Sequence, residues 1–182
     1  GTYGDQILSK AVIVAGGSTL RRLGVPGEER LHGSGVSYCA TCDGPLFKNK
    51  IVAVVGGGNS ALDAAEYLSR GSSKVYLIHR KDGFNGEQIL IDQVNKIPNI
   101  ELVSNSTIKE IKGDKTVTSL VYLSGKKETE IKVDGIFIEI SDAKNHHLLG
   151  DPFIKISNTL RKEIITDTTK TGSLAQKCGF IQ

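Results

Sequence analysis

The chain has 182 residues, of which 38% are hydrophobic and 24% are charged. This suits one large domain, or a small domain with extra segments, and argues against wholesale disorder. The net charge is only +3, from 23 basic and 20 acidic residues, so neither nucleic acid nor an anionic membrane is expected as a partner. No apolar run is long enough to cross a bilayer and no signal segment opens the chain, so we expect a cytoplasmic protein.

The first elements are a strand and a linker. An apolar run at residues 11–15 is typical of a short buried strand, and it ends in Gly16 and Gly17. Residues 20–34 are rich in glycine and charge and contain one proline. Such a composition is typical of a linker.

A compact unit follows. Residues 51–55 form a continuous apolar run, as in a parallel strand that is covered on both faces. Apolar residues recur at helical spacing over 59–70, and a second apolar run occupies 75–78. A helix is predicted over 86–97, closed by Pro98. This succession predicts a βαβ unit, which is right-handed in nearly all proteins.

The pattern changes after residue 100. Short alternating runs at 106–111, 116–123 and 127–133 are separated by turns, and they predict a β-meander. Residues 135–138 are again apolar and are expected to return to the main sheet. The predicted fold class is therefore α/β: a Rossmann-like, three-layer nucleotide-binding domain with an added β-meander.

A glycine loop, Gly56-x-Gly58-x-x-Ala61, follows the 51–55 strand and opens the 59–70 helix. The first glycine permits a tight turn, the second lets the backbone approach a pyrophosphate, and the small third residue lets the helix pack on the strand. The helix N-terminus adds free N–H groups and a positive dipole end. The loop predicts dinucleotide binding, with a glycine-rich turn that holds no ligand as the alternative.

The end of the second strand bears on which dinucleotide is bound. An NAD site has a carboxylate about twenty residues past the glycines, which accepts a hydrogen bond from the ribose 2′-hydroxyl. This chain has His79, Arg80 and Lys81 there, and cationic side chains pair with a 2′-phosphate. NADPH is therefore favoured over NADH, with a solvated basic turn as the alternative. Asp82 follows closely and would blunt the preference.

The second chemical motif is Cys39-x-x-Cys42. In such a pair one thiolate can attack a substrate disulfide, and the other resolves the mixed disulfide. Asp43 is adjacent to the second cysteine and is placed to move a proton during this exchange. The motif therefore predicts a redox-active dithiol.

Half of a zinc site and a merely structural pair are the alternatives for this motif. A zinc site needs two further ligands, and the candidates are Cys178 and the pair His146 and His147, which are distant in sequence and lack the usual spacing. Three cysteines do not form the framework of a secreted disulfide-rich protein, and no metal site is predicted.

Together these motifs resemble a known family. Residues 35–44, 54–61 and 79–84 resemble the redox segment, the NADPH loop and the 2′-phosphate segment of low-molecular-weight thioredoxin reductases, in the same order and spacing. These are FAD- and NADPH-dependent pyridine nucleotide-disulfide oxidoreductases, and the resemblance covers residues 11–140. The flavoprotein subunit of alkyl hydroperoxide reductase shares this module and stays as an alternative.

The resemblance implies a role for each site residue. Cys42 would face the flavin, Cys39 would attack thioredoxin, and Asp43 would be the acid/base. The implied cofactor-binding residues are Gly56, Gly57, Gly58, Asn59, Ser60, His79, Arg80 and Lys81. Electrons would pass from NADPH through FAD to the disulfide and on to thioredoxin, in a homodimer whose NADPH domain rotates on two linkers. A nucleotide-binding redox sensor without catalysis is the alternative from another class.

The resemblance also implies a domain layout. Residues 1–34 would be a remnant of the FAD domain and a linker, 35–138 the NADPH domain, and 139–182 a linker with an incomplete FAD-domain segment. The FAD site would be incomplete, so we expect a fragment with little activity alone. Asn85 and Lys81 stand where the family usually has arginine, which weakens strict selectivity for NADPH.

Overall fold

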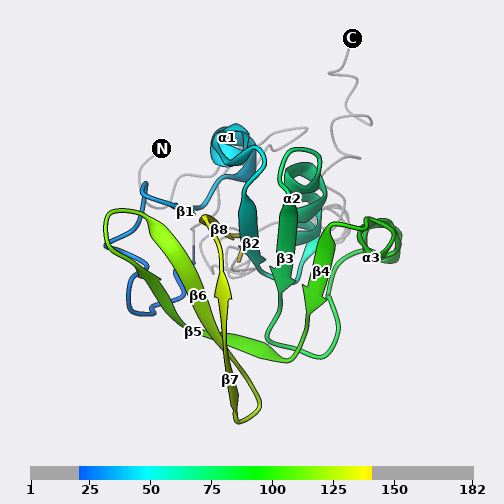
Figure 1. Ribbon diagram of the computed structural model, residues 1–182. Helices are drawn as coiled ribbons and strands as arrows, with labels where there is room; N and C mark the ends of the chain where they lie inside the picture. Colours follow the sequence, from blue (N-terminus) through cyan, green and yellow to red (C-terminus); the bar gives the residue numbers. More distant parts are fainter. Residues whose placement is uncertain (1–20, 141–182) are drawn as a thin grey trace, which may run out of the picture. The chain divides into compact units, whose positions relative to one another are not determined.

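In the computed structural model, which describes residues 21–140, one sheet is formed by five parallel strands. They are β1 (Val36–Ser37), β2 (Ile51–Val55), β3 (Lys74–Ile78), β4 (Ile100–Val103) and β8 (Gly135–Ile138). The strand order is β1-β8-β2-β3-β4, and each neighbouring pair is parallel. The carboxyl ends of these strands therefore lie along one edge of the sheet (Figure 1).

Two helices cover one face of this sheet. They are α2 (Asn59–Ser69) and α3 (Gln88–Asn95) (Figure 1). Successive side chains of a strand point to opposite faces, and the side chains of Val52 and Val54 in β2 pack with α2 in one buried cluster. A strand buried in this way explains the continuous apolar run of the sequence.

An antiparallel sheet covers the other face. It consists of β5 (Ser106–Gly113), β6 (Val117–Ser124) and β7 (Lys127–Lys132), in the order β5-β6-β7. The remaining side chains of β2, Ala53 and Val55, pack with Ile108 and Leu120 of this second sheet in a separate buried cluster. The described residues thus form three layers, and the predicted α/β class with an inserted meander is confirmed.

The strands predicted at 51–55, 75–78 and 135–138, both helices and the meander are confirmed, with ends shifted by a few residues. The short β1 and β4 were not predicted, and neither were the one-turn helices α1 (Ala40–Asp43) and η1 (Gly44–Phe47). Two residues are too few to show periodicity, and β4 is a half-exposed edge strand without a continuous apolar run. The strand predicted at 11–15 lies outside the described residues.

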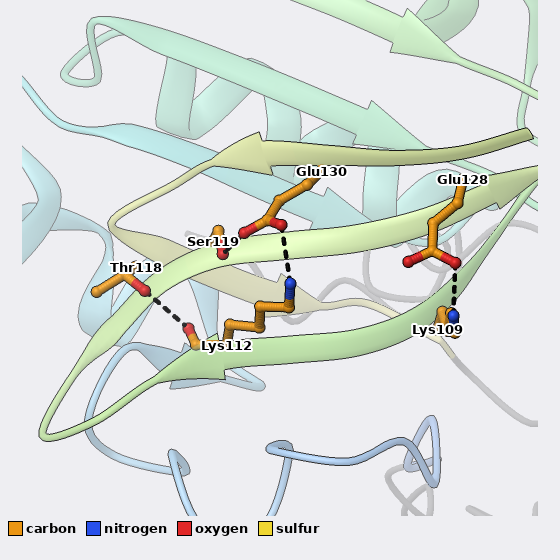
Figure 2. Close-up of polar contacts among 6 residues, drawn as sticks. All are labelled: Lys109, Lys112, Thr118, Ser119, Glu128 and Glu130. Carbon is orange, nitrogen blue, oxygen red and sulfur yellow. Dashed lines mark hydrogen bonds and ion pairs between the residues drawn. The ribbon is translucent and has the colours of Figure 1, made fainter.

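The exposed edge strand β7 carries glutamates whose side chains reach across β6 to lysines of β5. Lys109 pairs with Glu128, and Lys112 Nζ lies 2.8 Å from Glu130 Oε2 (Figure 2). The hydroxyl of Ser119 donates to the other Glu130 oxygen at 2.6 Å. Exposed pairs of this kind add at most about 1 kcal/mol each, but charge on an edge strand discourages pairing with another chain.

The segment before β1 packs against the second sheet. The Ile111 amide donates to the Pro26 carbonyl at 2.9 Å, and the Val117 amide donates to the Ser34 carbonyl at 3.0 Å. The side chain of Leu31 is fully buried in the core on this face. These residues fall in the same compact unit as the two sheets, while the predicted boundary between 34 and 35 stays a prediction.

One buried carboxylate, Glu28, organises this segment. Its two oxygens accept the amides of Leu23 and Gly24 at 2.9 and 2.7 Å, and one of them also accepts the Tyr38 hydroxyl at 2.8 Å. Burial alone raises the pKa of Glu28, but the hydrogen bonds together lower it below its ordinary value. Burial, followed by the bond to Glu28, raises the pKa of Tyr38 to about 12.

We expect Glu28→Gln to lower the free energy of unfolding at neutral pH by about 1–3 kcal/mol, because an amide replaces one charged acceptor with a donor that has no acceptor nearby. Since the pKa of Glu28 is lowered in the folded chain, its contribution is present above the ordinary carboxyl pKa and is lost as the pH falls through the folded-state pKa. Urea unfolding at pH 7 and at acidic pH measures both effects. The exposed neighbour Glu29 is the control, and an equal loss in Glu29→Gln would contradict the prediction.

Candidate active site

Each chemical motif follows the carboxyl end of a parallel strand. Cys39 comes after β1, Gly56 directly after β2, and His79 directly after β3, with Glu139 directly after β8. Because β8 lies between β1 and β2, the order along the edge is Cys39, Glu139, Gly56 and His79. In open α/β sheets, ligands bind at this edge, where the strand order reverses.

The two cysteines of the motif form a disulfide, with their Cα atoms 5.3 Å apart. Cys39 caps helix α1, and its sulfur accepts the Cys42 amide at 3.2 Å. The Thr41 hydroxyl lies 3.4 Å from the same sulfur. Cys42 is exposed and Cys39 is half-buried, so the pair is accessible at the surface of the described domain. A sulfur that accepts N–H groups is one that can carry the thiolate charge.

Asp43 is tied to the same turn through Ser37. The Ser37 hydroxyl donates to Asp43 Oδ2 at 2.6 Å, and the Cys39 amide donates to Ser37 Oγ at 3.0 Å. The structure therefore ties Asp43 to the disulfide turn through Ser37, and its role as a group that moves a proton stays a prediction. Ser37 was not predicted, because a buried serine in a two-residue strand has no sequence signal.

The first two glycines of the loop are required by packing. A Cβ on Gly56 would lie 2.3 Å from the Glu139 carbonyl oxygen and 2.7 Å from the Ala61 Cβ. A Cβ on Gly57 would lie 2.1 Å from Nδ1 of His79. No side chain fits at either place, because real Cβ contacts are not shorter than van der Waals distance.

Gly58 differs from its two neighbours, because nothing lies within 4 Å of the position that its Cβ would take. It caps the N-terminus of α2, which has eleven residues. Within residues 21–140, the amides of Gly58, Asn59 and Ser60 donate no hydrogen bond to another group. Open space beside free helix N-terminal amides is what a phosphate group needs.

His79 packs over the glycine loop. Its side chain is 8% exposed, and its ring stacks on Phe84 with centroids 5.5 Å apart. Burial lowers the pKa of His79, and the charges of Lys81 and Arg80 lower it further, so the ring is neutral at pH 7. Its Nε2 is buried and has no hydrogen-bond partner among the described residues. Such an atom calls for a ligand or a water molecule.

Arg80 and Lys81 are exposed, and in the described stretch neither forms an ion pair with a carboxylate. Asp82, which was expected to blunt their charge, accepts a hydrogen bond from Asn105 Nδ2 at 2.7 Å. The Asn85 amide donates to the Gly57 carbonyl, also at 2.7 Å. The basic loop is thus fastened to the glycine loop, with its two cationic groups free to bind an anion.

Glu139 is a second residue of the site that the sequence analysis did not predict. Its Oε1 accepts the Ala40 amide of helix α1 at 3.4 Å, its carbonyl oxygen is the atom that crowds Gly56, and burial raises its pKa. The available signal was a lone carboxylate directly after a buried strand. It could not be interpreted without knowing which strands flank β8.

Residues 21–140 bear on the zinc alternative and on the expectation that no segment crosses a membrane. That stretch contains no group of three or more His, Cys, Asp or Glu side chains that could hold a metal ion. Cys178, His146 and His147 lie outside it. None of the helices in that stretch is long and apolar enough to span a membrane.

Comparison with known proteins gives consistent matches. Residues 2–170 match the family described as pyridine nucleotide-disulphide oxidoreductase. The thioredoxin reductase of Listeria innocua is 45% identical over 135 residues, which are 72% of this chain and 42% of that protein. The crystal structure of Lactococcus lactis thioredoxin reductase matches with a TM-score of 0.69 and 39% identity, over 82% of this chain and 52% of the other.

The matches extend beyond one reaction name. A Pseudomonas fluorescens protein named glucosaminate ammonia-lyase is 45% identical over 143 residues, which are 76% of this chain and 45% of that protein. The chain thus spans less than half the length of these curated relatives.

Proposed function

Since the chain belongs to the pyridine nucleotide-disulphide oxidoreductase family, we propose that it is the nucleotide-binding, disulfide-bearing part of a thioredoxin-disulfide reductase. One observation carries the proposal. The disulfide turn and the glycine loop lie at the same edge of the sheet, and both contact Glu139. An electron donor bound at the loop and an electron acceptor in the turn therefore belong to one site.

The cysteines would act in sequence on a partner disulfide. In the reduced pair, the Cys39 thiolate attacks one sulfur of the partner, and a mixed disulfide forms as the partner's other sulfur leaves. Cys42 then attacks Cys39, which restores the Cys39–Cys42 disulfide and releases the reduced partner. Asp43, held at the turn by Ser37, would take up and return the protons of the thiols.

The free groups of the loop support pyridine-nucleotide binding. Gly58, Asn59 and Ser60 would hold the pyrophosphate, because their amides are unpaired and open space lies beside Gly58. Arg80 and Lys81 would hold the 2′-phosphate. We propose NADPH and FAD as cofactors, which would supply a hydride and a carrier for its two electrons when bound. No described residue is assigned to FAD.

The proposed partner is thioredoxin or a thioredoxin-like protein, encountered in a reducing cytoplasm by a homodimer of the whole reductase. Transfer from the pre-reduced chain to oxidised thioredoxin tests this without any flavin. We expect one thioredoxin disulfide to be reduced per chain as Cys39–Cys42 re-forms. If glutathione reduced the Cys39–Cys42 disulfide but no electrons passed to thioredoxin, the proposal would be wrong. Faster transfer to a peroxiredoxin-type disulfide would indicate the alkyl hydroperoxide reductase subunit instead.

Nucleotide preference gives a second test. Replacing Arg80 and Lys81 together by glutamine should weaken NADPH binding about 10- to 100-fold, because two charge-assisted contacts to the 2′-phosphate are lost. NADH lacks this phosphate, so its affinity should change by less than about threefold. Calorimetric titration of the chain measures both affinities. The exposed Lys126 and Lys127, replaced in the same way, are the control. An unchanged NADPH affinity in the Arg80 and Lys81 variant would favour the solvated basic turn.

A further inference from the structure

Glu139 touches both chemical motifs of the edge. Its backbone carbonyl abuts Gly56, and its amide donates to the Val55 carbonyl at 2.9 Å. Its side chain leaves the strand and reaches the Ala40 amide at 3.4 Å. Ala40 directly follows Cys39 and is the first residue of helix α1. The carboxylate is therefore one residue from the disulfide and is anchored by the strand that ends beside the glycine loop.

The carboxylate has few compensating contacts. Within the described part of the chain, the Ala40 amide is its one hydrogen-bond donor, and no cation forms an ion pair with it. Burial raises the pKa of Glu139, while the Ala40 bond opposes that rise. The other ionisable groups of the turn are Asp43, which is held by Ser37, and Cys39 and Cys42, which can ionise once the disulfide is reduced. Glu139 thus places a carboxylate with one hydrogen-bond donor and no cationic partner among the described residues next to the dithiol turn.

We propose that Glu139 is a positioning residue that holds the Cys39–Cys42 turn against the end of β8 and sets the equilibrium between its disulfide and dithiol forms. The inference rests on the proposed dithiol chemistry. A nearby carboxylate disfavours the thiolate, and a reduced pair whose thiolate is disfavoured gives up its electrons more readily. Glu139 therefore makes the reduced pair a stronger reductant toward the partner disulfide.

The test is the equilibrium of the 182-residue chain with reduced and oxidised glutathione. Glu139→Gln keeps an oxygen that can accept the Ala40 amide but removes the charge. We expect it to shift the equilibrium toward the dithiol by about threefold to tenfold, the size of a shift of one-half to one pKa unit in a neighbouring thiol. Glu139→Leu removes the acceptor as well, and should give the same shift together with faster hydrogen exchange of the Ala40 amide.

Glu128→Gln, an exposed carboxylate on β7, is the matched control and should leave the equilibrium within about twofold of the unmodified chain. An unchanged equilibrium in Glu139→Gln would overturn the inference. This holds even if Glu139→Leu lowered the stability of the fold, because a purely structural role for Glu139 predicts a loss of stability without a shift of the equilibrium. A disulfide that glutathione cannot reduce would overturn both this inference and the proposed function. A shifted equilibrium in a chain that cannot reduce thioredoxin would leave the inference standing and overturn the proposed function alone.

Discussion

Replacing Cys42 by serine should abolish turnover of electrons to a partner disulfide and should trap the partner on Cys39. Cys39 alone can still attack, but no second thiolate resolves the mixed disulfide. Replacing Cys39 by serine should remove the attack itself, so no partner is trapped. We expect transfer to fall at least about 10³-fold in both variants, since the thiolate is the nucleophile and serine is a far weaker one.

The measurement is transfer from the reduced chain to oxidised thioredoxin, with the covalent complex followed by non-reducing electrophoresis and mass spectrometry. The variants are made in a Cys178→Ser background, and Cys178→Ser by itself is the control that should behave as the unmodified chain. Nucleotide affinity should stay within about twofold, because neither sulfur belongs to the glycine loop. Trapping by Cys42 in place of Cys39 would reverse the assigned roles. Persistence of transfer in both variants would rule out the dithiol.

The pattern of elements was readable from the sequence because it depends on local signals. A continuous apolar run such as β2, and helical spacing such as that of α2, are set within a dozen residues. The glycine loop is equally local, because the strand, turn and helix that give it meaning are contiguous in the chain. The disulfide motif needs no more than four residues.

The neighbourhood of the disulfide depends on long-range topology and was not readable. Glu139 contacts Ala40 because β8, which follows the meander in the chain, lies between β1 and β2 in the sheet. The sequence of a single strand does not reveal its position in a sheet. Glu28 lies in a charged, glycine-rich stretch that is typical of a linker, and only its amide and hydroxyl donors explain why it is buried. Both are carboxylates whose surroundings are set by individual hydrogen-bond donors, which neither composition nor periodicity reveals.

Gly56 and Gly58 of the loop should respond differently to replacement by alanine, because the position of a Cβ is crowded at Gly56 and open at Gly58. Gly56→Ala should lower the free energy of unfolding by about 3 kcal/mol, because its Cβ meets a backbone carbonyl that cannot move aside. Gly58→Ala should cost less than about 1 kcal/mol, because its Cβ enters open space at a helix cap whose backbone any residue can adopt.

Gly58→Ala, which should barely change stability, should strongly weaken nucleotide binding. Its added methyl group occupies the space through which a pyrophosphate approaches the free amides of α2, so we expect at least a tenfold loss of NADPH affinity in a stably folded chain. Urea unfolding and calorimetric titration measure the two quantities separately. Gly71→Ala is the control, because nothing surrounds its Cβ position and it is remote from the loop, so neither quantity should change. Unchanged affinity in Gly58→Ala would mean that the open space beside α2 is not where the nucleotide binds, and that the loop glycines serve packing alone.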